Sequence, residues 1–289
     1  MDKKKIDKLA SQLFLVAALL LGVIIIAILI FMSKQGLVTF KDVSPQEFFF
    51  SAVWSPDNNK FGALSFIIGS LLVTLTATLV GGPLGILSSL FIAKLAPGWM
   101  RNILKPAVNL YMAIPSVVYG FIGLTVVVPW VRNFFHVAGG FGIFTTSLIL
   151  AIMILPTIIS ISTDALGGVP RELEEGSLAL GATYWQTMWH IVLPTAMPGI
   201  ATAIVLGMAR AIGETMAVQM VIGNTPQLPK SIFSPTSTLP SEIVVEMGNT
   251  PFGSAWGNSL FLMALVLLVI SLLLILLVRK ISAGKEVRA

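Results

Sequence analysis

Two opposite charges lie in a segment that is otherwise apolar enough to cross a membrane. Arg210 and Glu214 stand four residues apart in the stretch GMARAIGETMAVQMVIGN, residues 207–224, and no other formal charge falls inside an expected span. Residues four apart on a continuous helix share one face, so we expect the two side chains to pair. Each charge costs roughly 2.5–3.5 kcal/mol on insertion scales, so ionisable groups at such a depth are functional candidates that face a bundle interior or a watery path.

The chemistry of this pair suits an oxyanion. A guanidinium offers a planar fork of donors that matches phosphate in particular. The Glu214 carboxylate accepts a hydrogen bond from a protonated phosphate and repels a fully ionised anion such as sulfate, and it neutralises Arg210 when the path is empty. The two residues therefore predict a translocation path for a protonatable oxyanion. The alternative is a buried ion pair that only sets the register of the helix.

A second polar segment, EGSLALGATYWQTMWHIVLP at residues 175–194, predicts a hook of two short helices facing water. Pro170 suits the first turn of a helix, because its missing N–H would be unpaired there. Three carboxylates follow where the helix dipole favours anions, namely Glu172, Glu174 and Glu175. Gly181 can end this helix in a left-handed conformation, and Thr183 with Gln186 forms a capping box for the next one. The alternative is an interfacial amphipathic loop without a partner.

The elements that must position these residues are membrane helices. The chain has 289 residues, of which 56% are hydrophobic and only 11% are charged, against roughly 25% charged residues in soluble domains. The absence of cysteine excludes disulfides and thiolate sites, and two histidines are too few to propose a metal site. The net charge of +5 reflects the flanks of membrane spans, and no basic stripe with interleaved aromatic residues indicates nucleic acid.

The apolar runs predict an all-α integral membrane protein with six transmembrane helices. Residues 1–33 hold a basic tail and a first helix, which is too long an apolar run for a signal peptide, and an extracytoplasmic loop follows at 34–62. The core at 63–278 contains the other elements, which are five helices at about 63–93, 106–128, 143–163, 197–222 and 256–278, with the hook in a loop at 164–196. Gly81-Gly82-Pro83 and Pro156 interrupt two of these helices, and a basic tail occupies 279–289.

Charge distribution predicts the orientation of the chain. With six spans both termini lie on one side, and that side also receives most of the 18 basic residues. The positive-inside rule places this side in the cytoplasm. The hook falls on the same side although it is acidic, which is easier to understand if it binds another protein.

The hook resembles a cytoplasmic loop of ABC-importer permeases, which carries E-A-A, three residues, G, nine residues and I-x-L-P. The spacing is met in full, although Gly176-Ser177 replaces the usual pair of alanines. The resemblance implies a coupling helix that docks into a groove of the ATP-hydrolysing subunit. The residues matched to this coupling segment are Glu174, Glu175, Gly176, Ser177, Gly181, Ala182, Ile191, Leu193 and Pro194.

Two further motifs sharpen the resemblance. The stretches ARAIGETMAV at 209–218 and AIPSVVYGFIGL at 113–124 are similar to those of phosphate-specific ABC permeases, the PstC-type subunit in particular. This implies the type I ABC-importer permease architecture, with Arg210 and Glu214 as the charged pair on the translocation path. Ser116 and Tyr119 fall in the Pro-Ser-x-x-Tyr-Gly segment of the family and are candidates for the same path; the alternative for these two is a Pro-kinked packing segment.

We expect that the chain is not an enzyme, because it has no Gly-x-x-x-x-Gly-Lys-Ser/Thr loop to cradle a nucleotide. The resemblance implies a homologous PstA-type permease subunit, two PstB-type ATP-binding subunits that use ATP and Mg, and an extracytoplasmic PstS-type phosphate-binding protein. It implies no cofactor bound by this chain, and membrane lipid around it.

Two alternatives for function remain open. One is an ABC permease for another oxyanion such as phosphonate, sulfate or molybdate. The other is a proton-coupled secondary anion transporter with Glu214 as the proton site, although such carriers often show inverted repeats and none is visible in this sequence. An intramembrane enzyme would need a catalytic dyad or a metal cluster, which the sequence does not offer.

Overall fold

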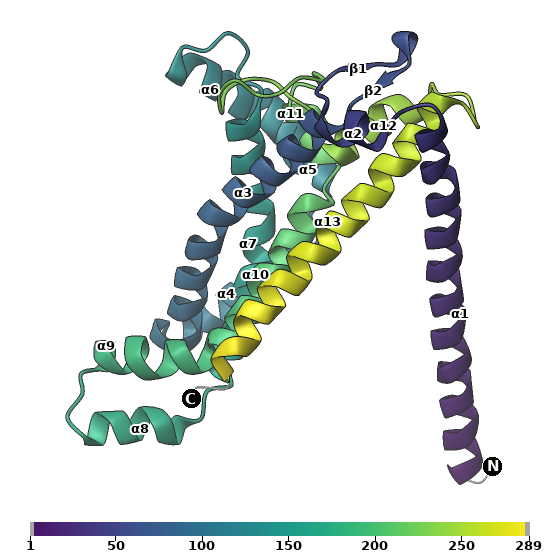
Figure 1. Cartoon of the computed structure of the whole chain (residues 1–289). Coiled ribbons are helices and arrows are strands. Elements are labelled where there is room, and N and C mark those ends of the chain that lie inside the picture. The colour runs from purple at the N-terminus through teal and green to yellow at the C-terminus, as the bar shows by residue number, and fades with distance from the viewer. Residues whose placement is uncertain (1–2, 287–289) are drawn as a thin grey trace.

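The computed structural model describes residues 3–286, and in this part of the chain six helices are long and apolar enough to cross a membrane, as predicted. These spans are Ser11–Lys41, Leu64–Leu95, Ser116–Phe135, Ile143–Gly167, Tyr184–Ile212 and Ala255–Leu276. The lower ends of α1 (Lys3–Val38) and α13 (Ala255–Glu286) lie at the same end of the molecule as the hook, and the two strands lie at the other end (Figure 1). We call these the hook end and the hairpin end.

The segment between the first two spans is more structured than the loop predicted at 34–62. Helix α1 runs to Val38, so the loop begins later than predicted. It then forms η1 (Thr39–Lys41), α2 (Pro45–Phe50), β1 (Trp54–Ser55), η2 (Pro56–Asn58) and β2 (Lys60–Phe61). The strands are antiparallel with Trp54 opposite Phe61, and Asn59 closes the turn at φ 52°, a left-handed conformation that asparagine tolerates.

Two predicted helix interruptions are absent. Helix α3 (Leu64–Leu90) continues through Gly81-Gly82-Pro83 into the π-helical turn η3 (Phe91–Leu95), and α7 (Ile143–Gly167) continues through Pro156. Neighbouring helices make proline tolerable inside a membrane helix. Gly81 instead permits close packing, because a Cβ there would lie 3.0 Å from the Ala151 carbonyl oxygen of α7.

The predicted third span is present, but its bounds are Ser116–Phe135 rather than 106–128. Residues 98–112 form a separate amphipathic helix, α4 (Gly98–Met112), and the chain breaks before Pro115, which disfavours helical geometry in the residue before it. The span that follows consists of α5 (Ser116–Ile122), η4 (Gly123–Val127) and α6 (Val128–Phe135). Pro106 is tolerated within α4.

The predicted fifth span is also present with other bounds, Tyr184–Ile212 rather than 197–222. The helical run begins much earlier, through α9 (Tyr184–Thr187), η5 (Met188–Val192) and α10 (Leu193–Ile212). It ends at Ile212, and a new short helix, α11 (Met216–Val221), follows the break at 213–215. The remaining elements are α8 (Arg171–Ala179) in the hook and α12 (Leu239–Met247) at the hairpin end. Helix α13 extends the sixth span, so the predicted tail at 279–289 is helical to Glu286, and residues 287–289 lie outside the described part, as do residues 1 and 2.

Helices α3, α7 and α10 form the centre of the molecule, with α13 packed on α10. Small residues allow the close approach, since a Cβ at Gly207 of α10 would lie 3.0 Å from Ile158 of α7. Helix α1 stands apart from this centre and meets α13 near the hairpin end (Figure 1). There the rings of Phe31 and Phe261 lie 5.5 Å apart, and the side chains of residues 11–20 are exposed.

Candidate functional site

The predicted pair of Arg210 and Glu214 does not form. Arg210 lies in the last turn of α10, whereas Glu214 stands in the break between α10 and α11, so the two residues do not share a continuous helix. The Glu214 carboxylate accepts a hydrogen bond from the backbone N–H of Ala217 at 3.3 Å. The first turn of a helix leaves such N–H groups without intrahelical partners, and this local donor replaces the guanidinium that the sequence predicted.

Arg210 faces the neighbouring helix α7 instead. Its Nη1 lies 3.5 Å from Oγ1 of Thr157, a long hydrogen bond. Both side chains are half-buried, and no ion pair of Arg210 occurs among the described residues. A guanidinium has five N–H donors, so most of them have no protein acceptor among the described residues.

Glu214 borders a narrow crevice on the hairpin side of the break. The residues that share it include Ser70 and Thr74 of α3 and Thr238 before α12. Glu214 is itself half-buried. The two charges thus lie on either side of the end of α10, with Arg210 directed to α7 and Glu214 bordering α3.

The segment with Ser116 and Tyr119 forms a packed joint beside this break. The hydroxyl of Tyr119 donates a hydrogen bond to the carbonyl of Tyr111 at 3.2 Å, which ties α5 to the end of α4. A Cβ at Gly120 would lie 2.9 Å from the Cα of Ala217 in α11. Packing therefore accounts for the buried Tyr119, and its part in translocation stays a prediction. Ser116 is half-buried at the start of α5, and its role also stays a prediction.

The first helix of the hook ends as predicted. Gly181 has φ +88°, its N–H bonds to the carbonyl of Leu178 at 3.0 Å, and the N–H of Ala182 bonds to the carbonyl of Ser177 at 3.2 Å. These two bonds are those of a Schellman motif. Pro170 is the residue before α8 rather than part of its first turn, so its predicted place was wrong by one position.

The capping box of the second hook helix is confirmed. The N–H of Gln186 donates to Thr183 Oγ1 at 3.3 Å, and the Gln186 side chain accepts from the Thr183 N–H at 2.8 Å. This helix is not a separate short one, because α9 passes through η5 into α10 without a break. The I-x-L-P motif lies at the junction, with Ile191 in η5 and Leu193 and Pro194 in the first turn of α10. The second helix of the hook and the helix that carries Arg210 therefore form one continuous helical run.

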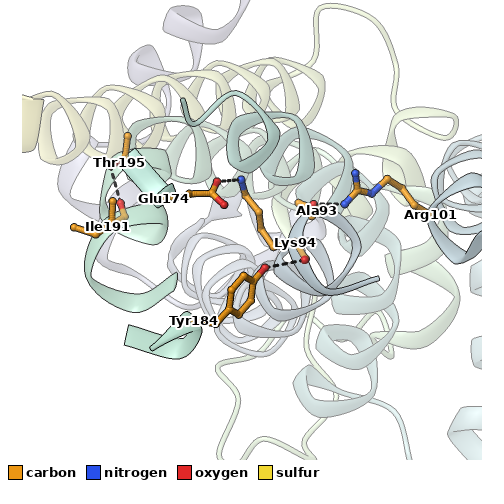
Figure 2. A network of polar contacts seen from close by, with 7 residues as sticks. All are labelled: Ala93, Lys94, Arg101, Glu174, Tyr184, Ile191 and Thr195. Atoms are coloured by element: carbon orange, nitrogen blue, oxygen red, sulfur yellow. Dashed lines mark hydrogen bonds and ion pairs between the residues drawn. The ribbon is translucent and has the colours of Figure 1, made fainter. Parts of the chain in front are cut away.

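A polar network, which the sequence did not reveal, attaches the hook to the end of α3 (Figure 2). Lys94 of η3 forms an ion pair with Glu174 of α8, and both side chains are largely shielded from solvent. The hydroxyl of Tyr184 donates to the carbonyl of Lys94 at 2.9 Å, and the Arg101 guanidinium donates to the carbonyls of Ile92 and Ala93. A usable signal existed, since the loop after the second span is basic, the hook is acidic, and both were predicted on one side.

The rest of the hook is exposed, including apolar side chains. Leu180 is 91% exposed and Trp185 is 58% exposed. Among the predicted coupling residues Glu175 and Gly176 are exposed, whereas the Ser177 hydroxyl bonds to that of Thr187 at 3.0 Å and so joins α8 to α9. Exposed apolar residues beside a free carboxylate indicate a surface prepared for another protein.

The hairpin end contains a contrasting polar cluster. The Glu246 carboxylate of α12 accepts hydrogen bonds from the indole N–H groups of Trp54 at 3.0 Å and of Trp256 at 2.6 Å. One turn earlier in the same helix, burial raises the pKa of Glu242 to about 7, and the charge of Glu246 adds to this effect. Three segments that are distant in the sequence meet at these carboxylates, and no periodicity in the sequence predicts that meeting.

Comparison with known proteins relates the chain to membrane transport. Residues 81–286 match the family described as binding-protein-dependent transport system inner membrane component. The chain is similar to the probable ABC transporter permease protein YqgH of Bacillus subtilis, with 46% identity over 99% of this chain and 94% of that protein. It is also similar to the phosphate transport system permease protein PstC of Pasteurella multocida, with 35% identity over 95% of this chain and 92% of that protein.

Solved structures support the fold. A chain of a bacterial alginate ABC transporter in complex with an alginate-bound periplasmic protein matches with a TM-score of 0.62 and 18% identity, over 96% of each chain. A chain of the MetNI methionine ABC transporter matches with a TM-score of 0.60 and 18% identity, over 81% of this chain and 99% of that one. At this level of identity the likeness concerns the fold alone.

Proposed function

The chain belongs to the binding-protein-dependent transport system inner membrane components and is a PstC-type ABC permease, and from this premise we propose that it conducts inorganic phosphate into the cytoplasm. A permease of this family is a multi-pass membrane transport subunit. The proposed cargo is supported by relatives named as phosphate transport system permeases at 33–36% identity, and by the free donors of Arg210.

The observation that carries the proposal is the unpaired guanidinium at the end of α10. Arg210 is half-buried, makes one long hydrogen bond to Thr157, and forms no ion pair among the described residues. An uncompensated cation inside a membrane span costs free energy, and an anionic cargo would offset that cost while it passes. Glu214, separated from Arg210 by the break in the helix, accepts a hydrogen bond from a protonated phosphate in this proposal.

We further propose that the hook end faces the cytoplasm, with both termini. The basic residues of the loop after α3 and of the termini support this orientation. The hook docks on one of two PstB-type ATP-binding subunits, which bind ATP and Mg, while a PstA-type permease completes the pore and a PstS-type protein delivers phosphate on the hairpin side. Closure of the ATP-binding subunits moves α8 and α9, and the continuity of α9 with α10 passes this movement to Arg210.

Uptake by the complete complex tests the proposal. Proteoliposomes that contain the complex and its binding protein are loaded with ATP and given radiolabelled phosphate with and without excess sulfate. We expect ATP-dependent uptake that sulfate does not compete and that falls at least about tenfold in Arg210→Ala, because the variant loses a charged anion ligand. Arg210→Lys, which keeps the charge without the planar fork, should retain an intermediate rate.

Three outcomes would contradict the proposal. Unchanged phosphate flux in Arg210→Ala would remove the guanidinium from the path. Preferential uptake of sulfate, molybdate or phosphonate would replace the cargo and leave the ABC mechanism in place. Uptake driven by a pH gradient without any ATP-binding subunit would indicate a secondary carrier instead.

A further inference from the structure

A polar cavity of about 110 Å³ lies between α4 and α7 toward the hook end. Its polar lining consists of Lys105 and Asn109 of α4 and of Ser160, Thr163 and Asp164 of α7. The predicted function did not use any of these side chains. The volume has room for several water molecules or for a small anion.

Thr163 also lines the cavity, but its hydroxyl does not face it. The residue is 3% exposed, and its hydroxyl is closed off from water and makes no hydrogen bond among the described residues. The side-chain donors at the cavity are therefore those of Lys105, Asn109 and Ser160.

A cation, Lys105, and a carboxylate, Asp164, line the cavity together. Nζ of Lys105 lies 3.3 Å from Oδ1 of Asp164, with the two side chains 48% and 72% exposed. An ammonium has three N–H donors, so a single contact to Asp164 leaves donors for an anion. The amide of Asn109 and the hydroxyl of Ser160 add two further donors, and Asp164 can accept a proton-bearing oxygen. The set as a whole fits a protonated oxyanion.

The cavity continues the face of α7 that Arg210 contacts. Thr157 is the partner of Arg210, and Ser160 and Asp164 follow it at spacings of three and four residues, which keep one face of a helix. At 1.5 Å per residue, Ser160 lies roughly 4.5 Å and Asp164 roughly 10 Å further along the helix axis toward the hook end. An anion that leaves Arg210 in that direction meets this cavity next.

We propose that the cavity is a second oxyanion site, at which Lys105, Asn109 and Ser160 hold phosphate after it leaves Arg210. The inference rests on the proposed function, because it assumes that phosphate is the cargo. Its consequence is a two-step exit, in which the anion transfers from a guanidinium in the middle of the membrane to an ammonium near the hook end. Asp164 then competes with phosphate for Lys105 and so favours release.

Cysteine modification tests the site, because the chain contains no cysteine. Ser160→Cys is introduced into the complex, whose partner subunits are made cysteine-free, and is modified by a negatively charged methanethiosulfonate applied to the hook side. We expect inorganic phosphate to slow this reaction several-fold. Gly167→Cys at the end of α7 is the matched control, since a Cβ there meets nothing within 4 Å, and phosphate should leave its rate unchanged. If the Ser160→Cys complex does not assemble, Asn109→Cys takes its place.

The charge requirement is tested in the same assay. Lys105→Gln should abolish protection by phosphate, and Lys105→Arg should preserve it. Protection that survives Lys105→Gln, or that is equal at the two cysteines, would overturn the site.

Phosphate uptake by vesicles that contain the wild-type complex separates the second site from the proposed cargo. Uptake without protection overturns the second site alone. Absence of phosphate uptake overturns the proposed cargo, and the inference falls with it.

Discussion

The two ends of the molecule satisfy their polar groups in opposite ways. At the hairpin end the carboxylate of Glu246 is enclosed by two indole N–H groups, and the segments around it pack with large buried side chains such as Phe48 and Phe61. At the hook end Glu174 is paired with Lys94, but Glu175, the next residue, is exposed, and so is Leu180. The hairpin end thus satisfies this carboxylate within the chain, whereas the hook end leaves the carboxylate of Glu175 exposed.

This difference separates residues that stabilise the chain from residues that act on a partner. Substitutions at the hairpin end remove contacts within this chain and should lower its own stability. Substitutions on the exposed part of the hook remove nothing within the chain and should change only how it works with a partner. The following predictions test this division.

Reversal of the exposed charge on the hook should have the largest effect. Glu175→Lys is expected to lower ATP-dependent uptake by more than about tenfold, because a reversed charge at a protein interface costs several kcal/mol. The thermal midpoint of the purified chain should stay unchanged, since Glu175 is exposed. Glu172→Lys, an exposed charge on the same helix but outside the motif, is the control and should lower uptake less than twofold. Equal effects of the two reversals would contradict a specific docking role.

A methyl group at the hairpin end tests the other side of the comparison. A Cβ at Gly69 would lie 2.3 Å from the carbonyl oxygen of Ser237, whereas a Cβ at Gly82 of the same helix meets nothing within 4 Å. Gly69→Ala should lower the free energy of unfolding by about 1–3 kcal/mol through overpacking. Gly82→Ala should leave it unchanged or slightly raised. Thermal unfolding of both variants in detergent gives the answer, and a similar midpoint for the two would contradict the packing described here.

The Lys94–Glu174 ion pair lies between these extremes, because it is shielded yet belongs to the hook. Lys94→Glu or Glu174→Lys alone brings two like charges together and should lower coupled uptake roughly threefold to tenfold. The double reversal restores the attraction and should recover most of the rate, as a double-mutant cycle measures. The amount of ATP hydrolysed per phosphate should rise in the single variants. If the double variant is as impaired as either single one, the pair does not transmit movement.

Protonation of Glu242 at the hairpin end should change stability gradually with pH. The folded pKa of Glu242 is raised to about 7 from an ordinary value of 4.5, so the folded chain binds more protons than the unfolded chain between these values. Stability therefore falls as pH rises through this window and stays level above it, with a slope of at most about 1.4 kcal/mol per pH unit. Glu242→Gln should remove this dependence, which thermal midpoints from about pH 5 to pH 8 would reveal. A midpoint that falls equally in the variant would assign the dependence to another group.

The sequence predicted what local patterns determine. Long uncharged runs predicted six spans, and Gly181 and the Thr183–Gln186 box predicted the termini of the hook helices, because helix ends depend on a few neighbouring residues. The breaks at 113–115 and 213–215 were missed, since apolar residues continue on both sides of each. This error carried over to the site, because the predicted contact of Arg210 with Glu214 assumed an unbroken helix.

Contacts between distant segments could not be predicted. Lys94 and Glu174 are separated by 80 residues, and Trp54 and Glu246 by 192. Neither pair shares a helix face or a strand register, so no period in the sequence relates them. For the first pair, the opposite charges of the basic loop after the second span and of the acidic hook indicated a contact. For the second pair, no pattern in the sequence indicated one.

The isolation of α1 has a consequence for how the protein is made. Phe31 is synthesised 230 positions before Phe261, its ring partner on α13, and at ribosomal rates of about 5–20 residues per second this is a wait of roughly 10–50 seconds. During that time α1 must reside in the bilayer without the neighbour that later holds it. An 18-residue window of the first span has a mean hydropathy of 3.4, which makes insertion independent of any tertiary contact, so the first helix anchors the nascent chain until the last helix has been translated.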